Sequence, residues 1–179
     1  MHLLLATLTA LATNAANDVD VDLDRRSLRL DAGYFGELGT HLGAALAASW
    51  QPSGAEVSGP VLGARVAGYR HAGNHFGARA ELHAGYRLQL PWNVALELVA
   101  GAGYLHTVVD GPLYDAATLQ PVTDLGRPSF SPSAALGIWW GPGFLRGGVF
   151  GQYPFNGRML LHPAVELGLS FSFDLGGGR

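Results

Sequence analysis

Four histidines and one aspartate near predicted turns are the residues best suited to bind a metal ion: His71, His75, His106, Asp110 and His162. Imidazole nitrogens and carboxylate oxygens are common protein ligands of zinc and copper. The spacing of these five residues does not match an established metal-binding motif. A metal site is therefore only one hypothesis, and solvated side chains are the simpler interpretation. We expect neither a metal nor another cofactor.

A second set of ionisable residues occupies alternating positions among small residues and could pair with one another or conduct protons. Its ten members are Glu37, His41, Arg65, Arg79, Glu81, His83, Arg87, Glu97, Arg146 and Glu166. Paired charges would form a salt-bridge network, because an unpaired charge is costly to bury. A proton or ion path would instead need a continuous wet channel. The elements that carry these residues decide between the two.

The dominant period of the sequence is two, which is typical of β-strands and not of helices. From His75 to Leu90 every charged residue falls on one face, and the other face carries only apolar residues. The segment 162–175 repeats this pattern. Both segments are long for ordinary strands, which average about 5 or 6 residues.

Turn residues divide the chain into eight expected strands, with a long loop at 110–128 and a second loop at 154–161. A helix over the alanine-rich run 42–48 is the local alternative. Eight antiparallel strands can close into a barrel without an exposed edge. The expected strands are 18–30, 34–50, 57–70, 75–90, 94–109, 129–140, 144–153 and 162–175.

The aromatic residues and the polar face indicate that the apolar side of this barrel faces lipid. Aromatic rings favour the two membrane interfaces. In this chain the tryptophans lie near one end of the strands, and tyrosines and a phenylalanine lie near the other. Trp50, Trp92, Trp139 and Trp140 lie beside turns at one end, and Tyr34, Tyr69, Phe76, Tyr104 and Tyr153 lie toward the other. We therefore expect an all-β fold: a closed antiparallel up-and-down transmembrane β-barrel of eight strands. Its interior is barely wide enough for side chains, which favours a plugging salt-bridge network over a pore.

Composition limits the classes of function. The chain has 179 residues, of which 48% are hydrophobic and only 14% charged, with 26 glycines and no cysteine. One domain is expected at this length, and disulfides and thiolate chemistry are excluded. All basic residues are scattered arginines and the net charge is −3, which argues against nucleic-acid binding. Residues 1–16 are apolar and then small, which predicts a signal peptide before a barrel domain at 17–179; a short buried helix is the alternative.

The arrangement of expected strands and turns over residues 18–175 resembles that of the small eight-stranded bacterial outer-membrane β-barrels. Three segments are similar to motifs in members of that group: Gly103-Tyr104-Leu105-His106-Thr107, Pro154-Phe155-Asn156 and Leu161-His162-Pro163. The resemblance implies location in the outer membrane of a Gram-negative bacterium, insertion by the barrel assembly machinery and no assigned catalysis.

Two other classes of protein remain as alternatives. Lipid A deacylases are also small outer-membrane barrels, and they use a histidine and a serine on one face of a strand. None of the seven histidines has a serine two positions away, so we expect no enzyme. The second alternative is a soluble periplasmic carrier of the lipocalin type, with its apolar face turned inward.

The expected role is structural or one of surface interaction. The loops at 110–128 and 154–161 are the expected binding regions, because loops on a rigid scaffold commonly carry recognition. The expected partners are outer-membrane lipid and lipopolysaccharide, whose phosphates could meet Arg127 and Arg158.

Overall fold

The computed structural model describes residues 26–38, 41–123 and 125–175, and it forms a closed barrel of eight antiparallel strands. The expected up-and-down fold is therefore confirmed. Among the described residues, no helix is long and apolar enough to cross a membrane. The barrel strands are β1 (Ser27–Glu37), β2 (His41–Gln51), β3 (Gly59–His71), β4 (His75–Leu90), β5 (Val94–Val109), β8 (Arg127–Trp140), β9 (Gly143–Phe155) and β10 (Arg158–Asp174).

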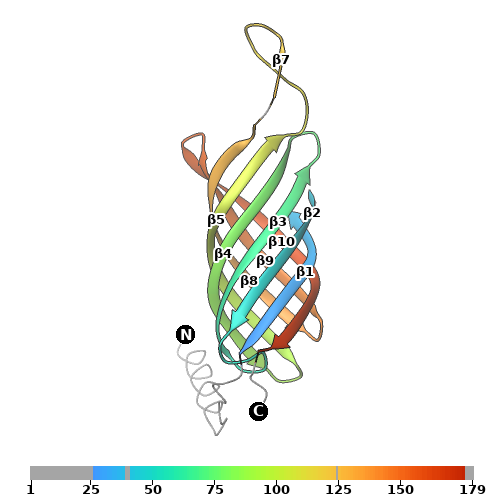
Figure 1. The fold of residues 1–179 in the computed structure, drawn as a ribbon, viewed down its shortest axis with the longest axis vertical. Coiled ribbons are helices and arrows are strands. Elements are labelled where there is room, and N and C mark those ends of the chain that lie inside the picture. The colour runs from blue at the N-terminus through green and yellow to red at the C-terminus, as the bar shows by residue number, and fades with distance from the viewer. Residues whose placement is uncertain (1–25, 39–40, 124, 176–179) are drawn as a thin grey trace, which may run out of the picture.

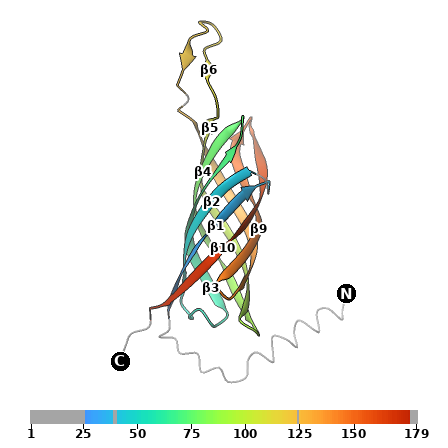
Figure 2. The ribbon, with the colours of Figure 1, turned by 90° about the vertical axis from the view of Figure 1, so that its right-hand side faces the viewer.

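Each barrel strand pairs with its neighbour along the chain, and β1 closes the barrel by pairing with β10. The start of β1 and the end of β10 lie at one end of the barrel (Figure 1). A small hairpin of β6 (Leu113–Tyr114) and β7 (Pro121–Val122) projects from the opposite end (Figures 1 and 2). We call this opposite end the outer mouth.

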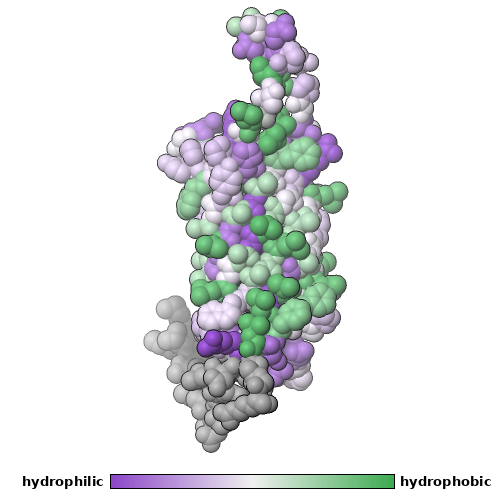
Figure 3. Space-filling view, viewed as in Figure 1, coloured by the Kyte–Doolittle hydropathy of each residue, from purple (hydrophilic) through white to green (hydrophobic). Residues whose placement is uncertain are grey.

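The two faces of the strands differ in chemistry as the alternation predicts. Leu42 and Leu82 are 74% and 72% exposed on the outside of the wall, whereas Arg79 and Glu97 are 4% and 1% exposed. Figure 3 shows apolar side chains along the outer wall, with hydrophilic ones gathered around the mouth and its projecting loop. The charges therefore lie inside the barrel.

The expected first two strands are wrong in their boundaries. The chain turns between Glu37 and His41, which face each other in the β1–β2 pair, and Leu38 has a φ of 52°. Alternation continues across this turn, so 34–50 read as one strand although it holds parts of two. The alanine-rich run 42–48 lies in β2 and is not a helix. The expected signal peptide at 1–16 and most of the expected strand at 18–30 lie outside the described residues.

The loop expected at 154–161 is also wrong. Strand β9 continues to Phe155 and β10 begins at Arg158. Asn156 and Gly157 join them with φ angles of 50° and 75°, and two consecutive positive φ angles are typical of a tight hairpin turn. The Asn-Gly pair was the signal for this hairpin. The long loop was expected correctly, but it spans 110–126 and contains the β6–β7 hairpin.

Two of the aromatic residues assigned to the membrane interfaces lie inside the barrel. Trp139 is 2% and Tyr69 is 4% exposed, whereas Trp50, Trp92 and Trp140 face outward. Trp139 and Trp140 are neighbours in β8, so their side chains point to opposite faces. Proximity to a turn therefore placed these rings at the correct end of the barrel but not on the correct face.

Candidate functional site

The interior consists of three successive layers, and β1 contributes to each of them. Arg29 and Asp31 belong to a network of ion pairs, Phe35 to an aromatic layer, and Glu37 to the outer mouth. All four side chains point inward because they occupy alternate positions of one strand.

The ion-pair network is a continuous chain of alternating charges drawn from six strands. Arg29 donates two hydrogen bonds to Glu97, at 2.7 and 2.9 Å, and its Nε lies 3.2 Å from Asp31. Arg146 joins Asp31 (3.3 Å) to Glu166 (3.0 Å). The chain continues from Glu166 through Arg65 and Glu81 to Arg79.

Neutral groups complete this network. Ser133 donates a hydrogen bond to Glu81 at 2.5 Å, and Arg79 donates one to Ser131 at 2.9 Å. A cavity of only about 10 Å³ remains beside Arg65 and Arg146, which is at or below the space that one water needs, about 10–15 Å³. The network therefore fills the lumen at this level.

Trp139 supports the network at the end away from the mouth. The guanidinium groups of Arg29, Arg87 and Arg146 lie 4.7, 5.3 and 5.3 Å from the centre of its ring. Its ring also stacks on that of Phe144, with the ring centres 5.8 Å apart. Positive charge over an indole face is attractive, which explains why an aromatic residue lies among so many arginines.

An aromatic layer separates the network from the outer mouth. The rings of Phe35, Tyr69 and Phe150 lie 5.8 to 6.1 Å apart, and Leu105 packs with them. Phe150 contacts both neighbouring layers. The Arg79 guanidinium lies 5.0 Å from its centre, and the His162 imidazole stacks on it at 4.8 Å.

Four polar side chains form a row across β1 to β4 at the outer mouth: Glu37, His41, His71 and His75. Glu37 pairs with His41 and His71 pairs with His75 in the strand register. Extending the β2–β3 register by two residues from its Gly43–Tyr69 pair brings His41 opposite His71. The two imidazoles are stacked with their centres 3.7 Å apart.

Glu37 is the centre of this histidine cluster, which we define as Glu37, His41, His71, His75 and His162. One carboxylate oxygen contacts Nδ1 of His41, and the other lies 2.7 Å from Nδ1 of His162. Glu37, His71, His75 and His162 line an open cavity of about 410 Å³. Unlike the network, the cluster therefore borders open space.

All ten residues of the expected salt-bridge set lie inside the barrel, but they fall into different layers. Glu37 and His41 belong to the mouth, and the other eight lie at the level of the network. Sequence reasoning missed Arg29 and Asp31, which complete the chain of charges. The strand expected at 18–30 had an alternation that broke near Arg25 and Arg26, so Arg29 could not be assigned to a face, and Asp31 lay beyond the end of that expected strand.

The five residues considered as metal ligands do not come together. His162 is 6% exposed inside the mouth, near His71 and His75. His106 lies on the outer face of β5, where its ring nitrogens lie 2.8 Å from the Tyr104 hydroxyl and 3.1 Å from the Leu125 carbonyl.

Asp110 has a structural role in the loops. It accepts hydrogen bonds from the Arg70 side chain at 3.0 and 3.3 Å and from the Gly73 amide at 3.0 Å. These bonds favour its ionised form, and the Arg70 bond, followed by the Gly73 bond, lowers the pKa of the carboxyl group. Asp110 thus ties the start of the long loop to the β3–β4 turn.

A serine and a histidine do meet inside the barrel. Ser49 Oγ lies 3.3 Å from Nε2 of His83. The residues belong to different strands, so a search for the two on one strand could not find them. Both are buried at 2% and 6% exposure, so the pair has no access to the outer wall.

Comparisons with known proteins show what this fold is similar to. No protein-family model matches the chain, and no curated protein matches its sequence. Among solved structures, Neisserial surface protein A (NspA) is 14% identical, with a TM-score of 0.51 over 82% of this chain and 95% of that one. The N-terminal β-barrel domain of Pseudomonas aeruginosa OprF is 15% identical, with a TM-score of 0.48 over 81% and 97%. The closed eight-stranded barrel and the match to NspA show that the fold is that of the small eight-stranded outer-membrane β-barrels.

Proposed function

We propose that this protein is an integral outer-membrane β-barrel with a closed interior and a structural or surface-interaction role. The outward-facing leucines carry this proposal. A soluble barrel would expose a wall on which Leu42, Leu82 and Leu98 are each more than 60% accessible, and such an apolar surface is stable only against lipid or a partner. In a membrane the same apolar surface would contact lipid tails. Because the barrel is closed, the backbone groups at every strand edge are hydrogen-bonded to a neighbouring strand.

The filled network supports a role other than that of an open pore. Ions would have to pass a level at which the chain from Arg29 to Arg79 occupies the lumen. The aromatic layer of Phe35, Tyr69 and Phe150 is a second barrier. The loops at the outer mouth are then the parts available to a partner, and Arg127 lies there at the cavity wall.

The two alternative functions, a soluble lipocalin-like carrier and a lipid A deacylase, receive less support. A lipocalin-like carrier needs an apolar interior, whereas this interior carries a network of four carboxylates and five arginines, the fifth being Arg87 at 3.6 Å from Glu97. A deacylase needs its histidine and serine where lipid can reach them, whereas Ser49 and His83 are enclosed by the wall. We therefore propose no catalytic activity.

Heat-modifiable migration on gels tests the membrane proposal. The protein, extracted from membranes in detergent, should change mobility on boiling, because a folded membrane barrel resists the detergent until heated. Recovery of the protein in the supernatant of lysed cells without detergent, with no change in mobility, would refute the proposal.

Conductance across planar lipid bilayers tests the closed interior separately. The wild-type protein should insert without producing stable channels. A variant without the aromatic layer and part of the network, Phe150→Ala with Arg79→Ala, serves as the comparison. Steady channels from the wild-type protein would show that the lumen opens.

A further inference from the structure

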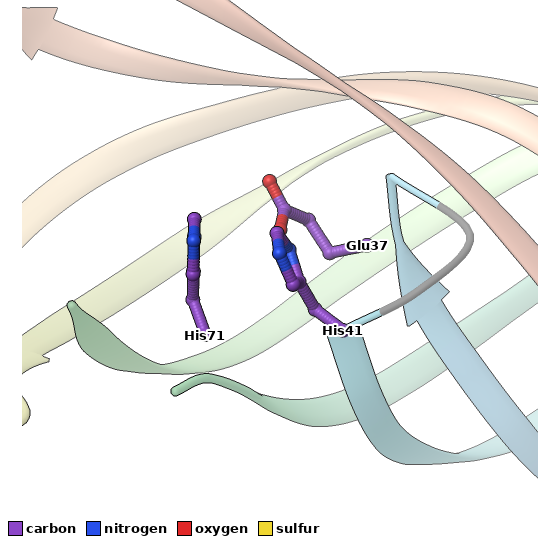
Figure 4. A group of neighbouring side chains, drawn as sticks. All are labelled: Glu37, His41 and His71. Carbon is purple, nitrogen blue, oxygen red and sulfur yellow. The ribbon is translucent and has the colours of Figure 1, made fainter. Parts of the chain in front are cut away.

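We propose that the outer mouth contains a divalent transition-metal site formed by Glu37, His41 and His71, and that Zn²⁺ fits its ligands. One ligand atom from each residue lies within 4.8 Å of the other two. Figure 4 shows the two imidazoles side by side with the carboxylate next to His41. Two nitrogens and one oxygen are a donor set that binds zinc, copper or nickel in proteins.

The two rings lie close enough for one nitrogen of each to reach a single ion. The stacked imidazoles of His41 and His71 are 3.7 Å apart. Two nitrogens bound to one tetrahedral zinc at about 2.0–2.1 Å are separated by about 3.3 Å. Because the lone pair of an imidazole nitrogen lies in the ring plane, two stacked rings cannot both face one ion. One of these rings must therefore rotate out of the stack to bind it, and both are only half-buried at the open mouth. The ion would then replace the direct contact between Glu37 and His41.

His162 holds the Glu37 carboxylate in position. Its Nδ1 lies 2.7 Å from one oxygen of Glu37, and its ring is fixed by stacking on Phe150. Groups that orient a metal ligand through a hydrogen bond typically change metal affinity when they are lost. His162 is therefore a positioning residue and not a ligand.

The site is accessible from outside and has room for an exchangeable ligand. Glu37 and His71 line the cavity of about 410 Å³. Three protein ligands leave a fourth position of a tetrahedral ion for water or for a group from another molecule. At this fourth position the ion would bind a carboxylate, imidazole or phosphate group of a molecule outside the barrel. The ion-pair network and the aromatic layer lie too deep to contact such a molecule.

Titration of tag-free protein in detergent, stripped of metal with a chelator, tests this site. Co²⁺ should give a saturable visible absorption spectrum at one ion per chain, and Zn²⁺ should displace it. His71→Asn should weaken binding by at least about tenfold and change the spectrum, because even groups one step removed from the metal affect affinity by about 10- to 100-fold. His162→Ala should weaken binding by about tenfold or more without abolishing the spectrum.

His106→Ala is the matched control, since His106 lies on the outer face and should leave affinity and spectrum unchanged. Each variant is first checked for heat-modifiable migration, so that a folding defect is separated from loss of a ligand. Non-saturable binding by the wild-type protein would overturn the proposal. An affinity of His71→Asn for Co²⁺ equal to that of the wild-type protein would also overturn it. The same holds if only His106→Ala fails to bind the ion. The result does not depend on where the barrel resides, because binding is measured in detergent.

Discussion

The network and the outer mouth both hold carboxylates against basic side chains, but in opposite settings. In the network each carboxylate contacts at least one arginine, and the cavity beside Arg65 and Arg146 is at or below the space that one water needs. At the mouth a single carboxylate, Glu37, contacts imidazoles beside an open cavity. Carboxylates that each contact an arginine, with little free volume beside them, form a plug, whereas a carboxylate and imidazoles beside open space can bind a ligand that enters from outside. Removal of a charge should therefore cost far more in the network than at the mouth.

The largest effect is expected from Glu166→Gln. Glu166 contacts both Arg65 and Arg146, so the variant leaves two buried arginines short of a counter-charge. Breaking a buried ion pair typically costs about 3–5 kcal/mol, and we expect a loss of that size in the unfolding free energy. Urea unfolding in lipid vesicles, followed by gel migration, measures it. Glu56→Gln, in the exposed loop before β3, is the control and should change stability by less than about 0.5 kcal/mol. Equal losses in both variants would mean that the network is not a plug.

A charge on the outer wall should have the second-largest effect. Leu82 lies near the middle of β4, and arginine on the lipid face of a barrel costs about 2–4 kcal/mol at the membrane midplane. We therefore expect Leu82→Arg to lower the unfolding free energy in vesicles by that amount. Leu119→Arg is the matched control, because Leu119 is as exposed as Leu82 but lies in the projecting loop. Similar stability of the two variants would show that the wall is not in contact with lipid.

The outer mouth should tolerate loss of a histidine. His71→Ala removes the stacking on His41 but leaves no buried charge unpaired, since Glu37 keeps its contacts with His41 and His162. Ring stacking contributes about 0.5–1.5 kcal/mol, so the metal-free variant should lose an amount in this range in the same assay. A loss equal to that of Glu166→Gln would remove the distinction between the two regions.

The smallest effect is expected at the Arg70–Asp110 pair in the outer loops. The pKa of Asp110 lies below its ordinary value of 3.8. The pair therefore stabilises the fold above the unfolded pKa, and this contribution is lost as the pH falls through the lower folded value. Carboxyl NMR titration should show the depressed pKa, and Arg70→Gln should raise it toward 3.8. An unchanged pKa in that variant would assign the shift to the Gly73 amide alone.

The sequence predicted the faces of the strands better than their partners. Alternation places Arg79 and Glu81 on one face because the period of a strand is fixed by its geometry, and the small residues of that face and the aromatic residues at the strand ends indicated that it points inward. Contacts between distant strands, such as Arg29 with Glu97, depend on the stagger of the closed barrel, which no local pattern contains. Prediction of the histidine row also required the position of the turn between Glu37 and His41. Without it, His41 could not be brought opposite His71.

Spin labelling of single cysteines is the most direct test of the central claim, that leucines face lipid and charges face inward. The chain has no cysteine, so one nitroxide can be attached at Leu82→Cys in lipid vesicles without further substitutions. We expect strong relaxation of the label by oxygen, which dissolves in lipid, and little by a water-soluble nickel complex. Strong relaxation by the nickel complex, with little by oxygen, would contradict it.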